Sequence, residues 1–131
     1  MNSSSAFAAY KQVDTGAAVA AATPHELVSL LMAGALKRVM EAKGAIARND
    51  SSSRGMAISK AISIVGELQG SLRDTDKNEV AQSLDQLYGY MTQTLVKANA
   101  EASEDKLQEV GELLMQIKEG WDGIAPRSTT V

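Results

Sequence analysis

Apolar side chains recur at helical spacing in four successive stretches of the chain, and short polar segments separate these stretches. The first stretch opens with Thr-Pro-His-Glu at residues 23–26. Thr23 suits the N-cap position, Pro24 suits the first helical position, and Glu26 completes a capping box. The apolar face that follows stops at residues 49–53, Asn-Asp-Ser-Ser-Ser, which favour turns and caps. We therefore predict a long first helix that begins at Pro24.

Three further helices follow from the same reasoning. The second is expected to begin near Ser53, and its apolar positions cover a sector of about 160°. A polar connection at residues 73–78 leads to a third helix that extends to about Ala100, and Ser103 then caps the fourth. Loops this short force neighbouring helices to be antiparallel. We therefore predict an all-α fold, an antiparallel up-down-up-down four-helix bundle over residues 23–124.

The segments on either side of the predicted bundle have a different character. Residues 1–22 contain Phe7, Tyr10 and Val13 at helical spacing, followed by small residues that pack weakly. We expect this region to be an N-terminal cap segment, short, helical and mobile, with a linker. We expect residues 125–131 to form a flexible tail.

Composition and charge narrow the possible functions. The formal net charge of −3 and the pI near 5.1 argue against nucleic-acid binding, which needs a surplus of Lys and Arg on one face. The chain has no Cys, which removes disulfides and thiolate metal sites and fits a reducing compartment. The N-terminal apolar runs are too short and interrupted for a signal peptide or a membrane span. We therefore expect a cytoplasmic protein without membrane insertion.

The sequence offers little material for catalysis. His25 is the only histidine, so a carboxylate and histidine metal site of the kind found in di-iron bundles cannot be assembled. No glycine-rich phosphate loop is present, and the serine-rich stretches have no partner base. We expect no enzyme activity, no catalytic or metal-binding residue and no cofactor. A phosphotransfer bundle that uses His25 remains an alternative.

The third predicted helix has more apolar surface than one helix neighbour would cover. One continuous stripe, expected to be the bundle seam, consists of Val80, Leu84, Leu87, Met91, Leu95 and Ala98. A second, semi-polar face widens this stripe and includes Ala81, Tyr88, Thr92, Val96 and Asn99. Either the helix simply contacts two neighbours, or the extra face is part of a groove that receives a helical guest.

Several motifs resemble the flagellar secretion chaperones of the FliS type, which hold flagellin. The segments are TPHELVSLLMAGAL, ISKAISIVGELQGSL, NEVAQSLDQLYGYMTQTLVKANAE and DKLQEVGELLMQIKEGW, in this order and preceded by Tyr10. The resemblance covers almost all of residues 7–124, and its most specific part is Leu87-Tyr88-x-Tyr90-Met91. Met32 and Ala33 depart from the family, which usually has Tyr and Asp there.

The resemblance implies a cytoplasmic type III export chaperone. Such a protein binds the disordered C-terminal segment of flagellin in an apolar groove, prevents premature polymerisation and assists delivery to the flagellar export gate. It also implies that the N-terminal segment is a movable cover over part of the groove. The residues expected to bind the partner are Tyr10, Val13, Ile58, Ile62, Val65, Tyr88, Thr92, Val96 and Asn99. Besides phosphotransfer, the remaining alternative is a structural bundle whose wide stripes meet their own copies.

Overall fold

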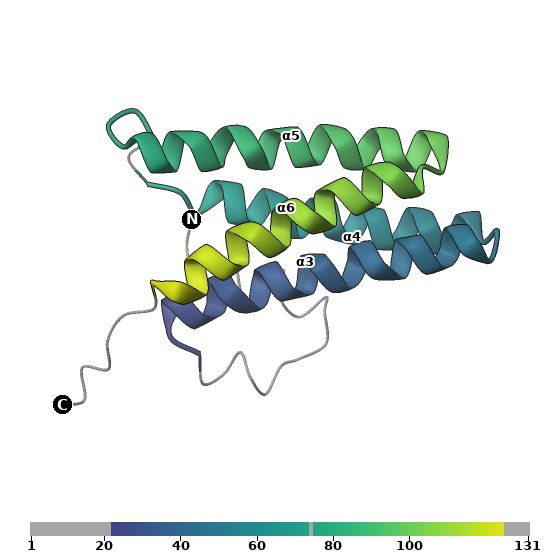
Figure 1. The fold of residues 1–131 in the computed structure, drawn as a ribbon, viewed down its shortest axis with the longest axis horizontal. Helices are drawn as coiled ribbons and strands as arrows, with labels where there is room; N and C mark the ends of the chain where they lie inside the picture. The colour runs from purple at the N-terminus through teal and green to yellow at the C-terminus, as the bar shows by residue number, and fades with distance from the viewer. Residues whose placement is uncertain (1–21, 74, 125–131) are drawn as a thin grey trace.

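The computed structural model describes residues 22–73 and 75–124, and this part of the chain forms a bundle of four helices (Figure 1). The helices are α3 (Pro24–Ala47), α4 (Ser51–Gly70), α5 (Glu79–Glu101) and α6 (Glu104–Gly123). Successive helices run in opposite directions, so the predicted all-α four-helix bundle is confirmed. Tyr10 and Val13, with the rest of residues 1–21, lie outside the described residues, as does the predicted tail at 125–131.

The start of α3 has the capping box that the sequence predicts. The Thr23 hydroxyl accepts a hydrogen bond from the Glu26 amide at 3.1 Å. In return, the Glu26 carboxylate accepts one from the Thr23 amide at 2.9 Å. Pro24 occupies the first turn, where no amide hydrogen is needed. These local bonds fix the residue at which the bundle begins.

The other helix starts also depend on short polar side chains. Helix α4 begins at Ser51, two residues before the predicted start, because the Asp50 carboxylate accepts the Ser53 amide at 3.0 Å. Asn78 caps α5, and Ser103 caps α6 as predicted. Between α5 and α6, Ala102 adopts the left-handed conformation at φ 49°. This single residue turns the chain back so sharply that α6 lies antiparallel to α5.

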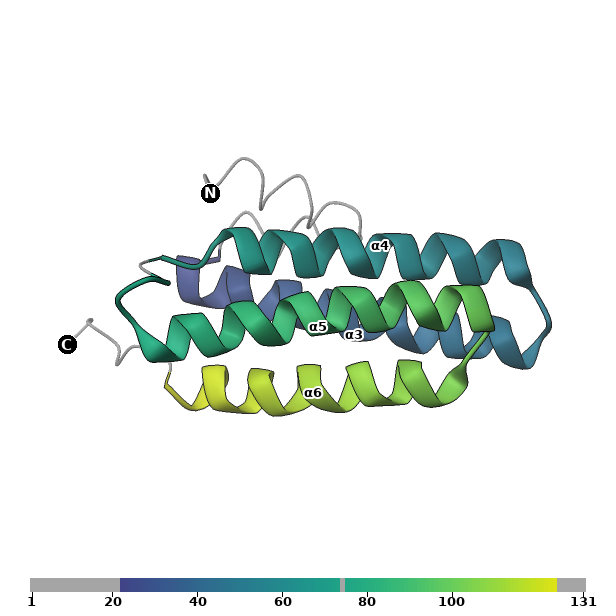
Figure 2. The ribbon, with the colours of Figure 1, turned by 90° about the horizontal axis from the view of Figure 1, so that it is seen from above.

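The helices are arranged in a ring, and each packs mainly against two neighbours (Figure 2). Helix α3 packs on α4 and α6, and α5 packs on the same two helices from the other side. The α3–α4 pair is the most extensively packed, whereas the α5–α6 pair is the least. Figure 1 shows the reason: α6 starts beside the end of α5 but slants across toward the start of α3.

The core runs along the bundle axis and is almost entirely aliphatic. Its largest fully buried side chains are Leu31, Met32, Ile58, Ile64, Leu68, Tyr88, Met91, Leu95, Leu107 and Leu114. Buried alanines such as Ala35, Ala42 and Ala61 let the helices approach closely. Met32, one of the two departures from the family pattern, is therefore a core residue.

The predicted seam of α5 is correct in its second half and wrong at its start. Met91, Leu95 and Ala98 are buried, and Leu84 and Leu87 are half-buried. Val80 was expected in the seam but is 69% exposed. The physical reason is the slant of α6, because the helix that would cover the first turn of α5 lies against α3 instead.

Candidate functional site

An apolar cavity of about 780 Å³ occupies the end of the bundle where α3 and α5 begin and α4 and α6 end. All four helices contribute to its wall. The apolar side chains that line it include Leu27, Val28, Leu68, Leu72, Leu84, Tyr88, Ile117 and Trp121. Val80 and Ile124 also line it while remaining largely exposed, so apolar surface continues to its mouth. A space of this size and lining is typical of a binding site.

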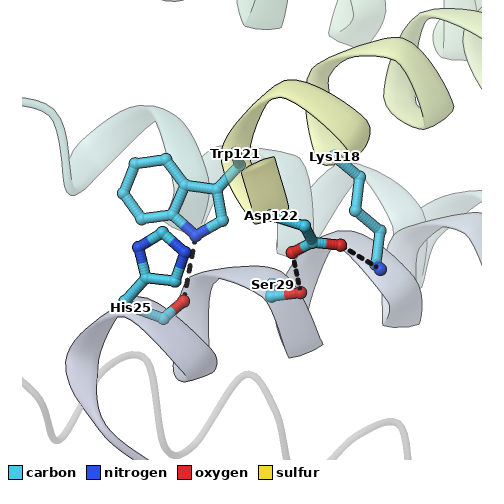
Figure 3. Close-up of polar contacts among 5 residues, drawn as sticks. All are labelled: His25, Ser29, Lys118, Trp121 and Asp122. Atoms are coloured by element: carbon cyan, nitrogen blue, oxygen red, sulfur yellow. Dashed lines mark hydrogen bonds and ion pairs between the residues drawn. The ribbon is translucent and has the colours of Figure 1, made fainter. Parts of the chain in front are cut away.

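The wall formed by α6 is held in place by a stacked pair of aromatic rings (Figure 3). The Trp121 indole and the His25 imidazole are nearly parallel, with an angle of 9° between planes and 4.3 Å between ring centres. The indole N–H also donates to the backbone carbonyl of His25 at 2.9 Å. Both contacts link the last turn of α6 to the first turn of α3, at the edge of the cavity.

A second polar contact ties the same two helix ends together (Figure 3). The Asp122 carboxylate accepts the Ser29 hydroxyl at 2.6 Å and the Lys118 ammonium at 2.8 Å. The hydrogen bond from Lys118 and then that from Ser29 lower the pKa of Asp122 below its ordinary value. The end of α6 is thus anchored to α3 and not to α5, which leaves the cavity between α5 and α6.

The structure separates the residues predicted to bind a partner into two groups. Ile58 and Val65 are completely buried between helices, and Ile62 is half-buried against the core. Tyr88 was expected on the semi-polar face that widens the seam and to bind the partner, but only 2% of it is exposed. Burial raises the pKa of its phenol to about 12. Its ring lines the inner side of the cavity, because α4 and the slanting α6 flank this turn of α5.

The remaining predicted residues lie on the second half of α5, away from the cavity. Val96 is 55% exposed, and Thr92 is half-buried. The side-chain oxygen of Asn99 accepts a hydrogen bond from the Arg54 Nε at 3.1 Å, so this acceptor is engaged within the bundle. Of the predicted residues that the structure describes, only Tyr88 reaches the cavity wall.

Sequence reasoning missed most of the cavity. Leu72, Ile117 and Trp121 stand at ordinary positions of apolar stripes, and no periodicity distinguishes them from core. A weak signal was present, because large apolar residues stand at the extreme ends of helices, where packing is thin. Val80 and Ile124 are the two such residues that remain exposed at the mouth.

The described residues show no sign of catalytic or metal chemistry. Within residues 22–73 and 75–124 there is no group of three or more His, Cys, Asp or Glu side chains placed to hold a metal ion. Among the same residues, no helix is long and apolar enough to cross a membrane. The main feature of this end of the bundle is the apolar cavity.

Comparison with known proteins identifies the family of the chain. Residues 6–128 match the family described as flagellar protein FliS. The flagellar secretion chaperone FliSB of Pseudomonas aeruginosa is 44% identical over 116 residues, which cover 88% of this chain and 92% of that protein. The flagellar secretion chaperone FliS of Vibrio cholerae is 36% identical over 90% of this chain and 87% of that protein. The flagellar secretion chaperone FliS of Salmonella typhimurium is 35% identical over 98% of this chain and 96% of that protein. The chain therefore belongs to the FliS family of flagellar secretion chaperones, which are not enzymes.

Proposed function

We propose that this protein is a cytoplasmic export chaperone for flagellin. It binds the disordered C-terminal segment of flagellin, prevents premature polymerisation and assists delivery to the flagellar export gate. The observation that carries the proposal is the apolar cavity of about 780 Å³ at one end of the bundle. Residues 22–73 and 75–124 leave this apolar space unfilled, and a bundle has no structural need for such a space, because interiors otherwise pack densely.

A disordered guest suits this cavity for a simple physical reason. A segment that coils with its neighbours in a filament has apolar positions which must stay covered before assembly. Folding such a segment onto a partner buries on the order of 1,000–3,000 Å² and loses a few kcal/mol to ordering. The cavity supplies the deepest part of the contact. Binding of the guest requires no nucleotide.

The rest of the binding path follows the outer side of α5. Thr92 and Val96 are accessible there, and Asn99 lies one turn further along. Ile62 contributes partly exposed apolar surface from the neighbouring α4. Ile58 and Val65 support this surface from below, since both are fully buried.

The N-terminal segment is proposed to act as a movable cover. Ala22 and Thr23, the first described residues, line the cavity. In the proposal, Tyr10 and Val13 shield apolar surface in the free protein and yield to the guest. Limited proteolysis tests this: residues 1–20 should be cut faster after flagellin is added. Unchanged cleavage would argue against displacement.

The central test is a binding measurement with purified monomeric flagellin and with flagellin that lacks its C-terminal segment. Only the complete protein should bind in calorimetry. Val80→Glu places a charge at the mouth of the cavity and should weaken binding by at least about tenfold. Met56→Glu is the matched control, because Met56 is similarly exposed but does not line the cavity. Equal binding by the two variants would remove the cavity from the site.

Phosphotransfer through His25 is disfavoured by the packing of its ring. Phosphorylation needs an accessible ring nitrogen, and one of the two, His25 Nε2, is buried while the imidazole is stacked on Trp121. Self-association through the wide stripes is the other alternative. Size-exclusion chromatography of the protein alone and with flagellin distinguishes it, since a structural bundle would form oligomers without the guest.

A further inference from the structure

Trp121 combines features of a binding residue and of a packing residue. It is the only tryptophan in the chain, and it is half-buried in the wall of the cavity. Its N–H is already bonded to the His25 carbonyl, so the ring has no unsatisfied polar group to turn toward a ligand. The part of the indole that borders the cavity is therefore purely apolar.

The orientation of this ring is fixed before any partner arrives. One face is covered by the parallel His25 imidazole, and the hydrogen bond sets the rotation of the indole (Figure 3). A large aromatic side chain normally loses rotamer freedom when it binds a partner. An anchor that is already held in one orientation avoids most of that loss.

Trp121 is not the main attachment of α6 to the bundle. The side chains of Leu107, Val110 and Leu114 are fully buried and hold the first half of the helix against the bundle. At the far end, the hydrogen bond from Ser29 to Asp122 holds the helix to α3 independently of the indole. Removal of the indole would therefore leave α6 attached while it changes the wall of the cavity.

We propose that Trp121 contacts the apolar anchor of the bound guest, and that His25 is the positioning residue that orients its indole. The inference rests on the proposed function, because the guest is the flagellin segment. It adds a specific contact that the sequence pattern did not indicate, and it gives the sole histidine of the chain a role that does not involve proton or phosphate transfer.

A fluorine spectrum tests the contact directly. Protein that contains fluorotryptophan has a single resonance, from Trp121, and unlabelled flagellin adds none. Addition of complete flagellin should shift this resonance, whereas flagellin without its C-terminal segment should leave it unchanged. In calorimetry, Trp121→Ala should weaken binding by at least about tenfold, and Trp121→Phe by less.

A matched control separates contact from mere support. Leu113 is half-buried on α6 and packs on the core, but it does not line the cavity. Leu113→Ala should lower stability while affinity per folded molecule stays unchanged. His25→Ala should weaken binding by about two- to tenfold, and His25→Phe, which preserves the stack, should restore it. Urea unfolding of each variant gives the folded fraction.

The outcomes distinguish this inference from the proposed function. If flagellin binds but the Trp121 resonance does not move, and Trp121→Ala loses no more affinity than Leu113→Ala, the assignment of Trp121 is wrong while the chaperone function stands. If His25→Phe binds as weakly as His25→Ala, the positioning role is wrong. If complete flagellin does not bind the unmodified protein, both proposals fail.

Discussion

Tyr88 provides the sharpest test of the packing, because sequence pattern and structure place it differently. Truncation of Tyr88 to Ala removes a buried ring, because only 2% of the residue is exposed. An aromatic side chain buries about 150–250 Å², so at about 25 cal/mol per Å² the loss is about 4–6 kcal/mol. Since the ring borders an open cavity, solvent fills part of the space, and we expect about 3 kcal/mol.

Urea unfolding monitored by circular dichroism measures this loss. Tyr88→Phe is the control: it deletes only the hydroxyl and should change the free energy of unfolding by no more than about 1 kcal/mol. Val96→Ala, at an exposed position of the same helix, should cost less than about 0.5 kcal/mol. If Tyr88→Ala costs as little as Val96→Ala, then the ring is not buried and the described packing of α5 is wrong.

The same residue predicts a dependence of stability on alkaline pH. Burial raises the pKa of Tyr88 from its ordinary value of 10.0 to about 12. Between these values the unfolded chain releases the proton and the folded chain retains it, so deprotonation favours unfolding. The contribution of Tyr88 to stability is therefore complete below pH 10 and is lost as the pH rises toward 12. In urea titrations, Tyr88→Phe should show a smaller loss over this range, and an identical loss would contradict the assignment.

The remaining predictions concern helix ends and helix glycines, and urea unfolding measures each. Thr23→Ala removes the capping box of α3 and should cost about 1 kcal/mol. Gly66→Ala should stabilise by up to about 1 kcal/mol, because Ala favours the helix and, beyond the local helix backbone, none of the described residues lies within 4 Å of the added carbon. Ala102→Gly should also stabilise by about 1 kcal/mol, since φ there is 49°. Hydrogen bonds from Ser53 lower the pKa of Asp50 below its ordinary 3.8. The stability that they contribute should therefore be lost as the pH falls through the pKa of Asp50 in the folded protein, and Asp50→Asn should lose less. For each of these variants, an unchanged free energy of unfolding would refute the stated reason.

The cavity explains why the bundle has one loosely packed pair of helices. Helix α6 joins α5 through only Ala102 and Ser103, so their adjoining ends must stay close. At its other end α6 is drawn to α3 by the His25–Trp121 stack and the Ser29–Asp122 bond. A straight helix that meets both conditions must diverge from α5. The open end of the bundle is therefore a consequence of where α6 is anchored.

The sequence by itself determined the features that depend on neighbours along the chain. The capping box at Thr23, the cap at Ser103 and the short polar loops depend on bonds within a few residues, and so does the antiparallel order that follows from them. The aliphatic stripes are equally local, because their periodicity is that of the helix itself. The family could also be identified from sequence, since its motifs keep their order and spacing.

Only the tertiary structure decided which apolar residues are covered. Tyr88 and Val80 are both apolar positions of one helix, yet one is buried and the other exposed. The difference is set by the path of α6, which depends on contacts between residues more than ninety positions apart, such as Ser29 with Asp122. Helical periodicity gives the direction of a side chain around its own axis, but not the distance to the helix it faces. The cavity exists because that distance is large at one end of the bundle.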